Sequence, residues 1–330
     1  MNDILKSAQP LNSCAYPEIP AVAACLRNGG VAVLPTETVY GLGAVYNNLA
    51  ALASVFEIKN RPRFDPLIVH IAALEQINDL AAEIPPAAWS LAKEFWPGPL
   101  TLVLPKRDCV PDLATAGMPS VAIRMPRHPL ALELIKQTGA PLAAPSANRF
   151  GGISPTTAAA ARAELGDAVK FYLDGGPCAV GLESTVLSLL GPKPTLLRPG
   201  GIPLEAITKI IGSVHVPASD AEKQRLSPGG LPRHYAPATP LRLWRPPTLP
   251  PDAGHAALLT PLPIPDADAF AQVEVLAPDG NLTTAAANLF TAMRRLDASG
   301  RPCIYAVLAP EAGLGRAIND RLRRAAGGRA

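Results

Sequence analysis

The sequence predicts an α/β protein made of two domains. Over the first 210 residues, short apolar runs alternate with segments of helical periodicity, which is typical of a sheet with helices packed against it. The 330 residues are 48% hydrophobic and 17% charged, so the chain can fill its cores and is not expected to be disordered. Periodicity is lost at residue 212 and returns near residue 240, which divides the chain into a domain at 13–211, a linker at 212–240 and a domain at 241–330.

Strands of the first domain are predicted where a short apolar run lies between turn residues. These runs are Val31–Leu34, Leu67–Ile71, Thr101–Leu104, Val121–Arg124, Leu142–Ala144, Phe171–Leu173, Thr185–Leu189 and Thr195–Leu197. Helices are predicted where apolar residues recur three and four positions apart, and the first of them ends at Gly29 and Gly30. The helical segments are Ile19–Arg27, Leu49–Ile58, Ala87–Phe95, Leu130–Gln137, Thr156–Leu165 and Leu204–Ile211.

The second domain repeats the alternation on a smaller scale. Prolines are dense between Pro237 and Pro265, where edge strands and connectors are expected because proline lacks a backbone donor. One helix can be capped by Asn281 or Thr283, and the other ends in a basic turn that suits the helix dipole. We expect a small Rossmann-like α/β domain, without a dinucleotide site because no G-x-G-x-x-G follows a strand. Its strands are predicted at Leu241–Trp244, Ala256–Leu259, Val273–Leu276 and Cys303–Leu308, and its helices at Thr283–Leu296 and Leu314–Ala326.

Composition and missing motifs argue against several classes of protein. The net charge of +3 argues against bulk electrostatic attachment to nucleic acid. There is no signal peptide and no uninterrupted run of about 18 apolar residues, so we expect a cytoplasmic protein without a membrane span. The chain lacks a P-loop, an H-E-x-x-H zinc motif and a G-x-S-x-G elbow, and its histidines are scattered, so we expect no bound metal and no Ser-His hydrolase. The cysteines lack paired spacing and are expected to be reduced thiols: Cys14, Cys25, Cys109, Cys178 and Cys303.

We expect binding or catalytic residues at places where a predicted strand ends in small hydroxyl residues, glycines or cations. The first such place is Pro35–Gly43, in which an apolar strand ends in a Pro-Thr-Glu-Thr turn whose hydroxyls can address a small polar ligand. Gly41 and Gly43 permit a close backbone approach or a positive φ. A polar turn before a second strand explains the same residues equally well.

Cations gather at the second and third places. Lys59, Arg61 and Arg63 lie within five residues, just before the strand that ends at His70. A fixed cluster of this kind suits a triphosphate, although the end of a helix also favours cations. Arg124 lies near the end of an apolar strand, where its guanidinium needs either a buried carboxylate or a bound anion.

Three further segments have the same character. Ser146 and Asn148 follow a strand, and Ser154 is predicted to cap the next helix, whose free N–H groups would suit a phosphate. Gly181–Val186 and Leu196–Gly201 each place a hydroxyl or a cation beside glycines at a strand end. Each segment has an ordinary loop explanation, but six such places in one domain are hard to dismiss as coincidence.

Together these motifs resemble the threonylcarbamoyl-AMP synthase family, the YrdC-like proteins. The resemblance covers about residues 13 to 210, and the linker motif Arg233–Pro237 with the second domain resembles the long form of the family. It implies a YrdC-like twisted mixed sheet around a large concave cavity. The motifs that carry it are Pro35–Gly43, Lys59–His70, Trp96–Thr101, Arg124–Pro126, Pro145–Asn148, Glu183–Thr185 and Arg198–Gly200.

The resemblance implies a nucleotidyltransferase that condenses L-threonine, bicarbonate (or CO2) and ATP into L-threonylcarbamoyladenylate and releases pyrophosphate. A separate transferase complex would then modify the adenosine next to the anticodon of tRNA. The carbamate of threonine is itself an oxygen nucleophile, so positioning and charge stabilisation can suffice without a catalytic dyad. Mg²⁺ is expected to arrive with the triphosphate, because no acidic cluster suggests a dedicated metal site.

The resemblance also distributes roles among the motif residues. The L-threonine side takes Thr36, His70, Arg124, Ala144 and Ser184. The ATP side takes Lys59, Arg63, Ser120, Ser146, Ser154, Arg198 and Tyr235, the last as part of a lid formed by the linker. Catalysis is assigned to Lys59, Arg61 and Ser146, while Glu37 has no role.

Two alternative functions stay open. A carbamoyl-adenylating enzyme that uses carbamoyl phosphate shares this domain type, but it usually carries an acylphosphatase-like region and C-x-x-C zinc motifs, which are missing from this sequence. A module for double-stranded RNA would use the concave cavity, and a pI of about 8.6 permits weak RNA binding. The basic residues stand singly at strand ends rather than in a continuous stripe, which favours the enzyme.

Overall fold

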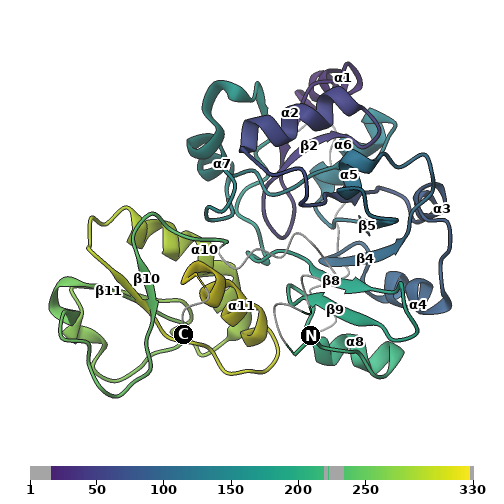
Figure 1. The fold of residues 1–330 in the computed structure, drawn as a ribbon. Helices are drawn as coiled ribbons and strands as arrows, with labels where there is room; N and C mark the ends of the chain where they lie inside the picture. Colours follow the sequence, from purple (N-terminus) through teal and green to yellow (C-terminus); the bar gives the residue numbers. More distant parts are fainter. Residues whose placement is uncertain (1–15, 219–221, 223–233, 328–330) are drawn as a thin grey trace.

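The computed structural model describes residues 16–218, 222 and 234–327. Within these residues the chain forms two sheets, each accompanied by its own helices (Figure 1). The larger sheet is built from residues before 200 and the smaller one from residues after 240. The α/β fold class is therefore confirmed. Cys14, residue 13 and the linker residues 219–221 and 223–233, among them Arg233, lie outside the described residues.

The larger sheet is mixed, and each strand predicted for the first domain is present in it. Its strands are β1 (Ala32–Leu34), β2 (Gly41–Val45), β3 (Ile68–His70), β4 (Leu100–Pro105), β5 (Ser120–Arg124), β6 (Leu142–Ala143), β7 (Phe171–Tyr172), β8 (Thr185–Ser188) and β9 (Thr195–Arg198). In the described part of the chain their order is β7-β1-β2-β6-β3-β5-β4-β8-β9. The pairs β1–β7, β3–β5 and β4–β8 are parallel and the others are antiparallel. This order places strands that are far apart in the sequence side by side.

The helices predicted for the first domain are present, with ends shifted by at most two residues. They are α1 (Ile19–Arg27), α2 (Leu49–Lys59), α4 (Pro86–Phe95), α6 (Pro129–Thr138), α7 (Ala158–Leu165) and α8 (Leu204–Ile211). Two short helices were not predicted, α3 (Ile77–Leu80) and α5 (Asp112–Thr115). Single helical turns of this length have too few residues to show a periodic pattern.

One strand, β2, is missing from the predicted strands, although the alternative explanation of Pro35–Gly43 includes a second strand at this place. It pairs with β1 on one side and β6 on the other, so it lies inside the sheet. Gly41 and Gly43 lie in this strand, and glycine has a low strand propensity, so the sequence pattern of β2 is weak. A Cβ at Gly43 would lie 2.7 Å from Leu34 Cδ2, so the two strands pack closely at this glycine. Of the two glycines singled out in the sequence, Gly41 lines the cavity described below and Gly43 does not.

The start of α7 also differs from the prediction. Thr157 caps this helix, and its side chain accepts a hydrogen bond from the Ala160 N–H at 3.2 Å. Ser154 is not the N-cap: its buried hydroxyl donates to Glu183 Oε1 at 2.5 Å. The Ser154 hydroxyl binds the carboxylate of Glu183, 29 residues away in the sequence, instead of the N–H groups at the start of the helix. The sequence alone does not show that these two residues are close in space.

The smaller sheet is parallel throughout, as expected of a Rossmann-like unit. Its strands are β10 (Leu241–Leu243), β11 (Ala257–Thr260), β12 (Gln272–Val275) and β13 (Ile304–Ala306), and its long helices are α10 (Leu282–Asp297) and α11 (Gly315–Ala325). Asn281 caps α10 by accepting a hydrogen bond from the Thr283 N–H at 2.8 Å. Asn281, and not Thr283, is therefore the N-cap of this helix.

The two units share an apolar cluster. Val39, Ile153 and Leu182 from the first unit pack in the same cluster as Tyr235 and the buried faces of α10 and α11. Figure 1 shows α11 on the side of the small unit that faces β8 and β9. The second unit is therefore packed against the first, close to several of the predicted site segments.

Two further observations concern the described residues only. No helix among them is both long and apolar enough to cross a membrane. Their cysteines, Cys25, Cys109, Cys178 and Cys303, are all free thiols.

Candidate active site

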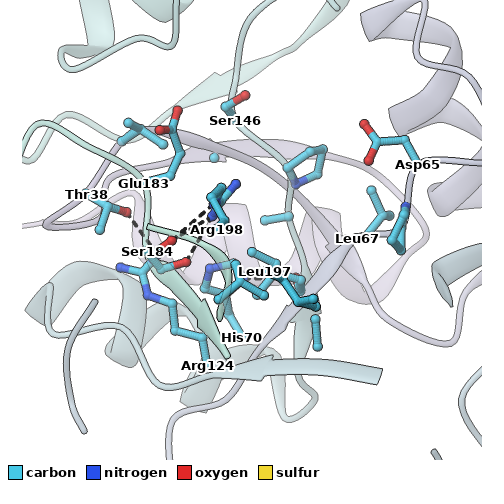
Figure 2. Close-up of a pocket in the computed structure, with 18 of the residues that line it drawn as sticks. Thr38, Asp65, Leu67, His70, Arg124, Ser146, Glu183, Ser184, Leu197 and Arg198 are labelled. Atoms are coloured by element: carbon cyan, nitrogen blue, oxygen red, sulfur yellow. Dashed lines mark hydrogen bonds between the residues drawn. The ribbon is translucent and has the colours of Figure 1, made fainter. Parts of the chain in front are cut away.

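A cavity of about 190 Å³ lies where several strands of the larger sheet end (Figure 2). The sheet register explains why its residues meet. His70 and Arg124 are direct partners on the parallel strands β3 and β5. Gly41 and Ser146 form an isolated antiparallel bridge beside β2 and β6. Polar side chains from separate motifs are thereby collected around one space.

Hydroxyl groups of the Pro35–Gly43 turn form one wall of the cavity. The Thr36 hydroxyl donates to the Val39 carbonyl at 2.7 Å and accepts from the backbone N–H groups of Thr38 and Val39. The Thr38 hydroxyl lies 2.7 Å from that of Thr36 and accepts a hydrogen bond from Arg124 Nη1 at 2.9 Å. The turn is thus held in one conformation by its own side chains.

Arg124 lies in an apolar strand and was expected to need either a buried carboxylate or a bound anion. The structure gives it a buried carboxylate, that of Glu37. Its Nη2 lies 2.7 Å from Glu37 Oε1, and only 4% and 7% of the two side chains are exposed. Glu37 also accepts a hydrogen bond from the Arg127 N–H at 3.0 Å. Burial alone would raise the pKa of the Glu37 carboxyl, but the Arg124 guanidinium and the backbone donors outweigh it and lower the pKa below its ordinary value. Glu37 therefore stays ionised and orients Arg124.

His70 is a neutral imidazole. Burial, followed by the nearby Arg124 charge, lowers its pKa to about 3. Its Nδ1 lies 3.1 Å from the Ile68 carbonyl, and a carbonyl can only accept, so Nδ1 carries the proton. In this tautomer Nε2 has the lone pair, and His70 adds no positive charge to the cavity.

Ser184 is held from two sides. Its hydroxyl lies 2.7 Å from the Thr101 hydroxyl and accepts a hydrogen bond from Arg198 Nη2 at 3.2 Å. Arg198 also donates to the Ser184 carbonyl through Nε at 3.2 Å and Nη2 at 3.0 Å. Gly200 is needed beside it, because a Cβ there would lie 2.4 Å from the Glu183 carbonyl. These contacts join two of the predicted segments, and Figure 2 draws the Arg198–Ser184 bonds.

Cations dominate another part of the cavity. Arg61 forms an ion pair with Asp65 at 2.8 Å and donates to the Pro66 carbonyl at 3.0 Å. The pKa of His234 reflects the positive charges around it. Burial lowers this pKa well below its ordinary value, and the charges of neighbouring cations lower it further: Arg61, Lys59, Arg324 and Arg198. This region of the cavity therefore favours an anion.

Three predicted ATP-side residues do not line the cavity. Lys59 is buried, and its ammonium donates to the Ser146 carbonyl at 2.6 Å and to the Asn148 carbonyl, so it holds the loop that carries Ser146. Arg63 is exposed on the loop beside Arg61. Ser154 is turned toward Glu183, as described above. Their assignments to ATP remain predictions.

Tyr235 brings the linker into the cavity wall. It is 4% exposed and takes a left-handed backbone conformation with φ of 60°. Its ring packs edge-on to His234 at 4.1 Å and against Phe290 at 5.7 Å, and the Arg321 guanidinium lies 5.1 Å from its centroid. The tyrosine is thus supported by α10 and α11.

The structure gathers most of the predicted site residues around this cavity. Those that line it are Thr36, Arg61, His70, Ser120, Arg124, Ala144, Ser146, Ser184, Arg198 and Tyr235. The cavity has further polar lining residues that had no assigned role: Thr38, Asp65, Thr115, Glu183, His234 and Arg324. All but Thr115 and Arg324 lie within the motifs selected from the sequence, so their proximity to assigned residues was the available signal. Within the described residues, no three His, Cys, Asp or Glu side chains are placed to hold a metal ion.

The fold and the site define a YrdC-like enzyme, in which polar strand ends surround a partly basic cavity. Residues 24–200 match the sequence model of the Sua5–YciO–YrdC family, described as "Telomere recombination". Residues 202–327 match the model described as "Threonylcarbamoyl-AMP synthase, C-terminal domain". The chain belongs to the threonylcarbamoyl-AMP synthase family and is an enzyme of that class.

Relatives extend along almost the whole chain. The threonylcarbamoyl-AMP synthase of Bacillus subtilis is 43% identical over 327 residues, covering 95% of this chain and 94% of its own. That of Pyrococcus abyssi is 41% identical over 320 residues, with 94% of each chain covered. A crystal structure of P. abyssi Sua5 complexed with L-threonine matches with a TM-score of 0.86 at 40% identity, and 94% of each chain is covered.

Proposed function

We propose that this protein condenses L-threonine, bicarbonate (or CO2) and ATP into L-threonylcarbamoyladenylate with release of pyrophosphate. The observation that supports it best is the chemical difference between two parts of one cavity. One part offers hydroxyls, a neutral imidazole and the Arg124 guanidinium, and the other offers a cluster of cations. An amino acid and a triphosphate need environments of these two kinds.

The hydroxyl-rich part is proposed to bind L-threonine. A guanidinium has five N–H donors, so Arg124 can keep its bonds to Glu37 and Thr38 and still face a carboxylate. Ser184 and Thr36 are fixed by their hydrogen bonds, and Ala144 contributes an apolar surface. The relative from P. abyssi was crystallised with L-threonine, which supports this assignment.

The cationic part is proposed to bind the triphosphate of ATP. Arg61 and Arg198 line it, Ser146 and Ser120 add hydroxyls, and Tyr235 covers it from the linker. Bidentate guanidinium donors stabilise phosphate oxygens more strongly than neutral groups do. Mg²⁺ enters as part of the nucleotide substrate, bound by its phosphates.

The reaction needs no side-chain nucleophile. The amine of threonine adds to bicarbonate with loss of water, which forms an N-carboxylate. One oxygen of this carbamate then attacks the α-phosphorus of ATP, the bond to the β-phosphate oxygen breaks, and pyrophosphate leaves. The charge that develops on the phosphates is stabilised by the fixed cations, and the protein contributes positioning and electrostatics. The product would serve a transferase complex that modifies the tRNA adenosine next to the anticodon.

Pyrophosphate release tests the proposal. Purified protein with Mg-ATP should release pyrophosphate only when both L-threonine and bicarbonate are present, and an adenylate of threonylcarbamate should appear in equal amount. Release that is indifferent to threonine would overturn the proposal, and release driven by carbamoyl phosphate would favour the carbamoyl-adenylating alternative. RNA binding without ATP turnover would favour the RNA-binding alternative.

A further inference from the structure

Helix α11 of the small unit is attached firmly to the catalytic sheet. Arg321 on this helix is fully buried, with 0% of its side chain exposed. Its Nε lies 2.9 Å from Glu183 Oε2 and its Nη1 donates to the Pro199 carbonyl at 2.7 Å. Glu183 and Pro199 are the immediate neighbours of Ser184 and Arg198. The position of α11 is thus defined relative to the cavity by two charged or polar contacts.

One turn further along α11, Arg324 lines the cavity itself. Its Nε lies 3.3 Å from Asp320 Oδ1, and 17% of its side chain is exposed. Its backbone carbonyl accepts a hydrogen bond from the His234 N–H at 3.2 Å, so it also holds the linker next to Tyr235. The guanidinium has five donors, so a bond to Asp320 does not prevent it from contacting a ligand.

The charge of Arg324 adds to that of the cationic part. Arg324 acts with Arg61, Lys59 and Arg198 in lowering the pKa of His234. It also acts with Arg61 and Arg198 on the Asp65 carboxyl, whose pKa is raised by burial against their opposing effect. Its guanidinium therefore lies in the same electrostatic region as the cations from the large sheet.

We infer that Arg324 is a nucleotide-binding residue, a cation that the second unit contributes to the phosphates of the substrate. The inference rests on the proposed function and goes beyond it, because the second unit then completes the active site instead of only packing against it. The ligand class is a polyphosphate, free or as part of a nucleoside triphosphate. The role of Arg321 is to hold α11 so that Arg324 reaches the cavity.

The neighbouring residue provides a matched control. Arg323 lies on the same helix and carries the same charge, but its side chain is 48% exposed, it pairs with Glu311 at 2.6 Å and it does not line the cavity. Arg324→Gln and Arg323→Gln therefore remove equal charge from adjacent positions. Only the first removes a donor from the cavity.

The experiment is calorimetric titration of the full-length protein with a non-hydrolysable Mg-ATP analogue, and separately with inorganic tripolyphosphate. Arg324→Gln should weaken both by about tenfold or more, the typical effect of a lost charge-assisted hydrogen bond. Arg323→Gln should bind like the wild type, and L-threonine binding should be unchanged in both variants. Equal affinities for the two variants would overturn the inference.

Two further measurements keep the outcome clear. If Arg324→Gln does not fold, Arg324→Lys replaces it, since lysine keeps the charge but lacks the planar fork and should show a smaller loss in the same direction. Unchanged binding in Arg324→Lys, with Arg324→Gln unfolded, counts against the inference. Suppose that Arg324→Gln weakens tripolyphosphate binding while the wild type shows no threonine-dependent pyrophosphate release. The proposed reaction is then refuted, and the assignment of Arg324 to phosphate binding is supported. A wild type that binds neither ligand overturns both.

Discussion

Replacing Glu37 by glutamine tests whether the buried pair with Arg124 organises the site. The change keeps the size of the side chain and its ability to accept from the Arg127 N–H, but it removes the negative charge. Arg124 would then be a buried guanidinium without its counter-charge. Two unit charges about 4 Å apart interact by about 4 kcal/mol at an effective dielectric constant of about 20. Removing one partner of a buried pair typically costs about 3–5 kcal/mol.

We therefore expect Glu37→Gln to lower the free energy of unfolding at pH 7 by about 3 kcal/mol, the lower end of that range because glutamine still accepts hydrogen bonds. With an unfolding entropy of about 2.1 cal/mol/K per residue, the melting temperature of a 330-residue chain should fall by roughly 4 °C. Urea unfolding followed by circular dichroism measures the difference. Glu94→Gln, an exposed carboxylate on α4, is the control and should leave stability unchanged.

The pH dependence has a defined sign. The pKa of Glu37 is lower in the folded protein than its ordinary value of 4.5, so its contribution is complete above that value and is lost as the pH falls through the folded-state pKa. The stability difference between the wild type and Glu37→Gln should accordingly be constant near neutral pH and shrink in acid. The double variant Glu37→Leu/Arg124→Met removes both charges and should recover much of the loss. A Glu37→Gln protein within about 0.5 kcal/mol of the wild type at pH 7 would refute the reasoning.

Two other predictions follow from single contacts. Lys59→Ala should weaken binding of an ATP analogue by about tenfold or more, because the loop that carries Ser146 loses the two charge-assisted hydrogen bonds that the Lys59 ammonium donates to it; an unchanged titration would contradict this. Gly43→Ala should destabilise the fold by about 1–3 kcal/mol, since the new methyl group would meet Leu34 Cδ2. Thermal melting measures the second effect, with Gly191→Ala, where a Cβ has open space, as its control.

Much of the fold and part of the site were accessible from the sequence. Apolar runs and helical periodicity are local properties, so each longer helix and every strand but β2 could be recognised from its own residues. Motif residues such as His70, Arg124, Ser146 and Ser184 could be selected because polar groups at the ends of apolar strands need partners. That they share one cavity was inferred only from the family resemblance.

The tertiary structure decided what depends on distant residues. Glu37 could not be assigned because its partner Arg124 is brought to it by the mixed order of the sheet. Ser154 has a local reason to cap a helix, and the buried carboxylate of Glu183 competes successfully for its hydroxyl. Arg324 looked like an ordinary basic residue at the end of a helix, and only the packing of α11 places it in the cavity wall. Local sequence determines which segments form, whereas ion pairs and cavity walls are made by residues whose proximity arises only when the chain has folded.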